Sequence, residues 1–197
     1  MDGPSRRVPK QERARAKRQA LLDAGLREFS AREYPEVTAR SIAKAAGVSV
    51  GTFYEYFDSK DVLLRTVQER LLRTFMERVV DDDAPDPAEA IRRGLALTYA
   101  FHVEHPRLHA TVEYRRRFDP ELEALMQTLD AAIAQRIRSA LQRWKVPGDE
   151  AVAFTIVAMA EGLVHRIVFG DPPGDPEGLL EHGGQLILGA LGTGGDQ

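Results

Sequence analysis

The sequence contains no cysteine, which excludes disulfide bonds, thiolate nucleophiles and cysteine-ligated zinc sites. Aromatic residues make up only 7% of its 197 residues, and no uninterrupted apolar run reaches the roughly 18 residues of a membrane-spanning helix. The sequence has no P-loop and no H-E-x-x-H motif. Its basic N-terminus lacks the apolar segment of a secretory signal. These absences favour a cytoplasmic protein that is not an enzyme, contacts no membrane and holds no cofactor.

Charge is divided unevenly along the chain. Residues 1–60 contain 12 Lys and Arg against 8 Asp and Glu, whereas residues 61–197 contain 15 against 22. The first 20 residues contain 7 Lys and Arg but only 2 Asp and Glu. A basic end on an acidic body is typical of a protein that contacts a polyanion through that end. The alternative is a frayed, solvated tail, and the segment that follows decides between the two.

Helical periodicity dominates the sequence and strand signals are almost absent. The pattern therefore predicts an all-α fold with about nine helices and no sheet. Segment 81–87, D-D-D-A-P-D-P, is expected to be a loop because proline and clustered Asp oppose a helix. The expected helices cover residues 10–31, 38–46, 50–57, 59–80, 88–103, 107–115, 120–144, 151–169 and 176–191.

The stretch A-A-G-V-S-V-G-T-F-Y-E-Y-F-D-S-K, residues 45–60, carries an unusual cluster of aromatic residues. Thr38 and Ser49 are placed to cap two short helices that are joined at Gly47. The small Ala43 allows these helices to cross closely, and Gly47 can adopt the left-handed conformation of a tight turn. This spacing predicts a helix-turn-helix, whose second helix enters the DNA major groove, although an ordinary helical corner has the same spacing.

Side chains around the second helix favour the DNA-binding alternative. Thr52 can bond a base or a phosphate, and Val50 can touch a thymine methyl group. Tyr54 and Tyr56 carry hydroxyl groups suited to phosphate oxygens, and Lys60 adds a positive charge just beyond them. The aromatic residues Phe53 and Phe57 are instead expected in the core.

The stretch V-T-A-R-S-I-A-K-A-A-G-V-S-V-G-T-F-Y-E-Y-F-D-S-K-D-V-L, residues 37–63, resembles the DNA-binding module of tetracycline-repressor (TetR) family regulators. The resemblance implies a basic arm and DNA-binding domain over residues 1–65 and a ligand-binding and dimerisation domain over residues 66–197. It also implies that Val50, Thr52 and Arg40 face bases. The residues implied to face the phosphate backbone are Thr38, Ser49, Gly51, Tyr54, Tyr56 and Lys60.

The chain departs from the family pattern at three positions. Glu33 stands where a glycine is frequent, Pro35 stiffens the entry to the next helix, and Tyr56 replaces a frequent histidine. None of these changes removes a phosphate-binding group, so they affect the expected local geometry and not the expected binding of DNA.

Two helices near the C-terminus are predicted to form a homodimer interface. Segment 151–169 is apolar nearly all round and should therefore be buried on more than one side. Together with 176–191 it can pair with its own copy in a four-helix interface. A dimer would let two helix-turn-helix units read the two halves of a palindromic operator. The alternative is that 151–169 is buried inside a monomer.

A mainly apolar effector pocket with a few polar groups is expected among the helices of residues 88–168. Glu161, inside an apolar helix, needs a partner such as His165, an arginine or a cationic ligand. His102, His105 and His109 have helical spacing, but Pro106 interrupts it, so no metal site is expected. The candidate effector contacts are Tyr99, His102, His105, Tyr114, Phe118, Met126, Phe154, Glu161 and His165.

The sequence thus predicts a dimeric transcriptional regulator, a repressor that binds operator DNA and is released by a small, mostly apolar molecule. The alternative from another class is a helical small-molecule-binding protein or enzyme in which the helix-turn-helix serves only for packing.

Overall fold

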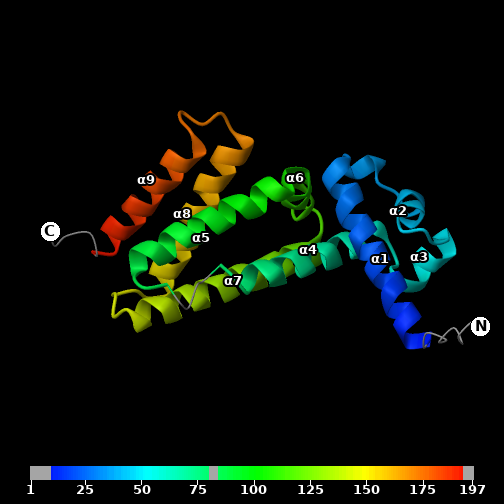
Figure 1. Ribbon diagram of the computed structural model, residues 1–197, viewed down its shortest axis with the longest axis horizontal. Coiled ribbons are helices and arrows are strands. Elements are labelled where there is room, and N and C mark those ends of the chain that lie inside the picture. Colours follow the sequence, from blue (N-terminus) through cyan, green and yellow to red (C-terminus); the bar gives the residue numbers. More distant parts are fainter. Residues whose placement is uncertain (1–9, 80–83, 193–197) are drawn as a thin grey trace, which may run out of the picture. The chain divides into compact units, whose positions relative to one another are not determined.

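The computed structural model describes residues 10–79 and 84–192, and the predicted basic arm of residues 1–9 and the acidic run 81–83 lie outside them. Within the described ranges the chain forms nine α-helices, one short 3-10 helix and no strand, which confirms the predicted all-α fold (Figure 1). The chain divides into two compact units, with the boundary between Glu69 and Arg70. Unit 1 here means residues 10–69, and unit 2 means the described residues from 70 onward.

Unit 1 contains the predicted helix-turn-helix segment. Its elements are α1 (Lys10–Ala31), the 3-10 helix η1 (Tyr34–Glu36), α2 (Ala39–Ala45), α3 (Val50–Tyr56) and the first part of α4 (Lys60–Met76). Helix α2 packs against both α1 and α3. Phe29, Ile42 and Phe53 are completely buried in this core. Gly25 allows a close approach of α1 and α4, because a Cβ atom there would lie 2.7 Å from Leu63 Cδ2.

Three helices of unit 2 begin where Asp and Pro follow each other in the sequence. Asp86, Asp119 and Asp175 each accept a backbone N–H as N-cap, and each is followed by a proline in the first turn of its helix. This arrangement uses a proline where its missing N–H costs nothing. The helices that begin in unit 2 are α5 (Pro87–Glu104), α6 (Pro106–Arg115), α7 (Pro120–Arg143), α8 (Glu150–Phe169) and α9 (Pro176–Ala190).

The expected helix limits agree closely with these bounds except at the end of α4. The sequence predicted that this helix would continue to about residue 80, but it ends at Met76. The Arg78 N–H donates to the Phe75 carbonyl, so a tighter turn closes the helix.

Helix α8 packs against α5, α7 and α9. The hydrophobic core around it includes Leu95, Leu141, Ile187 and Leu191. The prediction that 151–169 is buried on more than one side is wrong for the single chain, because its buried residues all lie on one face. Those residues are Ala153, Val164 and Ile167.

Candidate DNA interface and ligand cavity

The turn between α2 and α3 has the geometry that the sequence predicted. Thr38 Oγ1 accepts the Ser41 N–H at 3.0 Å, and Ser49 Oγ accepts the Thr52 N–H at 3.0 Å, so both predicted N-caps are confirmed. Gly47, at the turn, has φ of +69°, a conformation that residues with a side chain rarely adopt. These contacts fix the angle at which α3 leaves α2.

Helix α3 has one buried face and one open face. Phe53 is completely buried and Phe57 is 3% exposed, which confirms the prediction that both belong to the core. On the open face, Val50 is 36% exposed and Tyr54 is 56% exposed. Thr52 is half-buried, with its Oγ1 3.0 Å from Ser49 Oγ. The fold therefore holds α3 firmly from behind and presents its other face to solvent.

The remaining predicted DNA contacts differ in their exposure to solvent. Thr38, Arg40 and Gly51 are exposed, and Tyr56 is half-buried. Four further basic residues lie exposed in the N-terminal half of α1, and they are Arg13, Arg15, Lys17 and Arg18.

Lys60 has a structural role that the sequence did not reveal. Its Nζ donates to the carbonyl oxygens of Tyr34 and Val37, each at 2.8 Å, and lies 4.0 Å from the centre of the Tyr34 ring. The Tyr34 hydroxyl in turn donates to the Asp61 carboxylate. Residues 34–37 are thereby attached to the start of α4. No periodicity links these distant segments, so sequence patterns alone could not find the contact.

We expect Lys60→Ala to lower the free energy of unfolding by about 2 kcal/mol, because two carbonyls lose a charged donor. Lys44→Ala is the matched control, since Lys44 is exposed on α2, and it should change stability by less than about 0.5 kcal/mol. If Lys60 also faces a phosphate, Lys60→Ala should weaken binding to all DNA sequences equally and lower the salt slope by roughly 1. Chemical denaturation and DNA binding at several salt concentrations measure the two roles separately. Unchanged stability would contradict the structural role, and an unchanged slope would contradict the phosphate contact.

Unit 2 contains a partly open cavity of about 100 Å³, lined mainly by aliphatic side chains of α5, α7, α8 and α9. Thr98 and Glu161 bring polar groups to its wall, and Trp144 brings an indole ring. Phe75, from the last turn of α4, also lines it. Such a wall suits a small apolar molecule with one polar group.

Of the predicted effector contacts, Glu161 lines the cavity, and His102 and His165 lie beside Glu161. The other six do not line it: Tyr99, His105, Tyr114, Phe118, Met126 and Phe154. Tyr114, Phe118 and Phe154 are in fact 62%, 63% and 68% exposed. The lining residues that the sequence analysis did not select are aliphatic, such as Leu95, Ile137 and Ile156. They occupy core-facing positions, and no pattern separates a cavity wall from a filled core.

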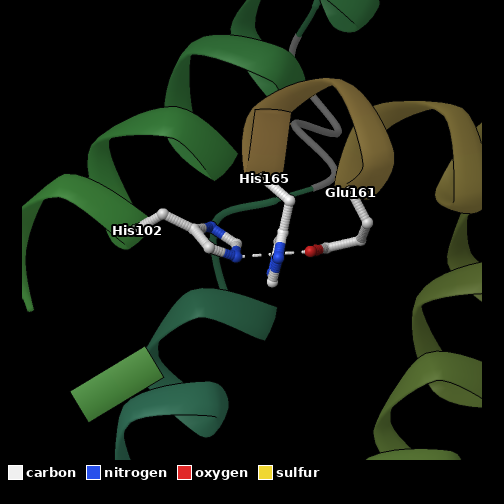
Figure 2. Close-up of side chains that lie close together, drawn as sticks. All are labelled: His102, Glu161 and His165. Atoms are coloured by element: carbon white, nitrogen blue, oxygen red, sulfur yellow. Dashed lines mark ion pairs between the residues drawn. The ribbon is translucent and has the colours of Figure 1, made fainter. Parts of the chain in front are cut away.

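His102 connects the polar groups beside the cavity (Figure 2). It is buried, its Nδ1 lies 2.9 Å from the Thr98 carbonyl oxygen, and its Nε2 lies 3.3 Å from a Glu161 carboxylate oxygen. Burial by itself lowers the pKa of His102, but the Glu161 carboxylate and the Thr98 carbonyl outweigh that effect, so the net shift is upward. Glu161 is half-exposed, and its observed partner is His102.

His109 stacks on His102, with ring centroids 4.4 Å apart. Its burial, followed by the nearby charge of His102, lowers the pKa of His109 to about 4. His105 lies apart from them, with its Nε2 3.8 Å from Glu104, because the chain turns at Pro106 between α5 and α6.

An all-helical chain with a capped helix-turn-helix and an open second helix is a helix-turn-helix DNA-binding regulator. Residues 21–67 match the family described as bacterial regulatory proteins, tetR family. The HTH-type transcriptional regulator EthR of Mycolicibacterium smegmatis is 29% identical over 135 residues, which cover 65% of this chain and 62% of EthR. The chain thus matches less than two thirds of that relative. Residues 21–67 therefore form a DNA-binding domain of the TetR family of transcriptional regulators.

Solved structures of similar fold cover almost the whole chain. A tetR-family transcriptional regulator from Streptomyces coelicolor has a TM-score of 0.75 at 22% identity, covering 90% of this chain and 82% of its own. The fatty acid degradation regulator FadR from Bacillus halodurans has a TM-score of 0.71 at 21% identity, covering 97% of this chain and 98% of its own. At this level of identity the likeness shows a common fold.

Proposed function

We propose that this regulator is a cytoplasmic repressor that binds a palindromic operator as a homodimer and releases it when a small, mostly apolar molecule enters the unit 2 cavity. The observation that carries the proposal is the arrangement of α3. Its buried side is anchored by Phe53, while Val50 and Tyr54 are exposed on its open side. In this proposal Val50, Thr52 and Arg40 face bases, and the surrounding hydroxyl and basic groups face phosphates.

The exposed side of α8 supports the homodimer. Phe154 and Phe169 are 68% and 41% exposed there, and Leu186 on α9 is 68% exposed. By length and mean hydropathy of 1.7, Glu150–Phe169 is also the one described helix that could cross a membrane, yet only 17% of its apolar window is buried. A second copy of α8 and α9 would cover this surface with an equally apolar one. Four helices would then form the interface, as expected for a symmetric dimer.

Helix α4 offers a route by which the effector acts. Lys60, at its start, belongs to unit 1, whereas Phe75, near its end, lines the cavity of unit 2. A molecule in the cavity therefore touches the same helix that carries the helix-turn-helix unit. By linkage, release requires the effector to favour a state of the dimer that the operator disfavours.

The experiment that tests the proposal is selection of DNA fragments from the source genome by the purified chain. We expect a small set of fragments that share an inverted repeat, because two identical units read two half-sites. The functions of the genes beside these fragments then suggest small molecules, and each of these can be tested for release of the bound DNA. Recovery of no enriched sequence would contradict the proposal and favour a helical binding protein whose helix-turn-helix is structural.

A further inference from the structure

Three side chains of unit 2 point toward one another from two helices, namely His102 from α5 and Glu161 and His165 from α8 (Figure 2). Each offers one ligand atom, and these atoms all lie within 4.8 Å of one another. The His102 Nε2 and the Glu161 carboxylate oxygen are 3.3 Å apart. Two ligands of a tetrahedral Zn²⁺ ion, with bonds of about 2.0–2.1 Å, are separated by about 3.4 Å. One pair of this cluster therefore already has the spacing of metal ligands.

The imidazole of His102 is oriented as a metal ligand requires. Its Nδ1 lies 2.9 Å from the Thr98 carbonyl oxygen, which can only accept, so Nδ1 carries a proton that it donates to Thr98. Nε2, the other ring nitrogen, is directed at Glu161. Metal-binding histidines commonly donate their second N–H to a backbone carbonyl, which fixes both tautomer and ring orientation. His102 has this support from its own helix.

Glu161 and His165 reach the same point because they are four residues apart on α8, so they lie on one face of the helix. His165 is half-buried, and its ring packs edge-on against His102 at a centroid distance of 5.1 Å. Among the described residues, the ring nitrogens of His165 have no hydrogen-bond partner. An imidazole without a bond of its own, beside a carboxylate and a second imidazole, is available to coordinate a cation.

The charges around the cluster favour a cation. The negative charge of Glu113, on α6, acts on the His102 imidazole, as the charge of Glu161 does. Asp130, on α7, is close enough to Glu113 and Glu161 to interact electrostatically with both carboxylates. Arg116, a positive group near Asp130, pairs with Glu113 at 3.3 Å and with Glu123 at 2.6 Å. The cluster thus lies near two further carboxylates, those of Glu113 and Asp130.

We propose that His102, Glu161 and His165 bind one divalent transition-metal ion, of which Zn²⁺ is the representative. Two imidazoles and one carboxylate suit Zn²⁺, whereas Mg²⁺ and Ca²⁺ prefer oxygen ligands alone. Three protein ligands leave at least one coordination position open. Because Glu161 also lines the cavity, that position is accessible to a polar group on a molecule inside it. The sequence analysis considered His102, His105 and His109 as metal ligands and expected no metal site. The proposed site keeps His102 and takes Glu161 and His165 as the other ligands.

The test is a Zn²⁺ titration of the full chain after chelator treatment, using a chromophoric zinc chelator as competitor and no DNA. We expect one Zn²⁺ per chain in the wild type, unaffected by a large excess of Mg²⁺. Glu161→Gln and His165→Gln should each weaken binding by roughly 100-fold or more, since loss of an outer-shell partner alone costs 10–100-fold. Both residues are half-buried, so both variants should fold, and circular dichroism checks this.

His182→Gln is the matched control. His182 is an exposed histidine of unit 2 whose Nδ1 also lies near the carbonyl four residues earlier, at 2.7 Å from Gly178, yet it is outside the cluster. The His182→Gln variant should therefore bind Zn²⁺ with the affinity of the wild type. Substitution of Zn²⁺ by Co²⁺ should give the visible absorption of four- or five-coordinate nitrogen and oxygen ligation. Wild-type binding below one ion per chain, displacement by Mg²⁺, or full affinity in folded Glu161→Gln and His165→Gln would overturn the proposal.

Discussion

The double variant Thr52→Ala and Tyr54→Phe is expected to lose roughly 1,000-fold in operator affinity. Each change removes one hydroxyl group from α3. In the proposed dimer on a palindromic site, both hydroxyls are lost twice, and each proposed hydrogen bond contributes about 1–1.5 kcal/mol. The ring of Tyr54, which packs edge-on against Phe53 with centroids 5.2 Å apart, stays in place. The loss should therefore come from the DNA contacts and not from the fold of unit 1.

The matched control makes the same two chemical changes in unit 2. Thr128→Ala and Tyr114→Phe remove exposed hydroxyls at positions to which the proposal assigns no DNA contact. Fluorescence anisotropy with the selected operator should show wild-type affinity for this control. Equal affinities of the two double variants would contradict the assignment of α3 as the reading helix.

The double variant Phe154→Asp and Leu186→Asp is expected to be a monomer at concentrations at which the wild type is a dimer. Both side chains are 68% exposed in the single chain, so the substitutions should leave its fold intact. In a symmetric interface, each buried aspartate appears twice without a partner, and each costs about 1–3 kcal/mol. Together these costs predict a dissociation constant raised at least roughly 1,000-fold, measured by sedimentation equilibrium.

Tyr114→Asp with Phe118→Asp is the control for the dimer variant. These two aromatic residues are also exposed, at 62% and 63%, and pack on each other with ring centroids 5.3 Å apart. They lie on and after α6, outside the proposed interface, so this variant should remain a dimer. A monomeric control, or a dimeric Phe154 and Leu186 variant, would place the interface elsewhere.

Local signals in the sequence predicted the helices well because caps and breakers act over a few residues. Thr38, Ser49 and Gly47 each specify one helix end through their own side chain or backbone, and the structure confirms all three. The repeated Asp-Pro pairs set the starts of α5, α7 and α9 in the same way. Agreement between local chemistry and the final fold is expected for a natural sequence.

Sequence patterns could not predict the contacts between segments that are distant in the chain. The bonds from Lys60 to the carbonyls of residues 34 and 37 depend on how η1 meets α4. The pairing of His102 with Glu161 likewise depends on how α5 packs on α8. The sequence indicated that Glu161 needs a partner, but helical spacing favoured His165, and only the fold brings all three residues together.

The central claim is that unit 1 binds duplex DNA, and binding at a series of salt concentrations tests it most directly. Labelled duplex should bind the chain, with log Kobs falling linearly with log salt and a slope of about −5 or steeper, as for six or more phosphate contacts. The operator should bind at least roughly 1,000-fold more tightly than an unrelated duplex. No detectable binding even at low salt, or a slope near zero, would contradict the account.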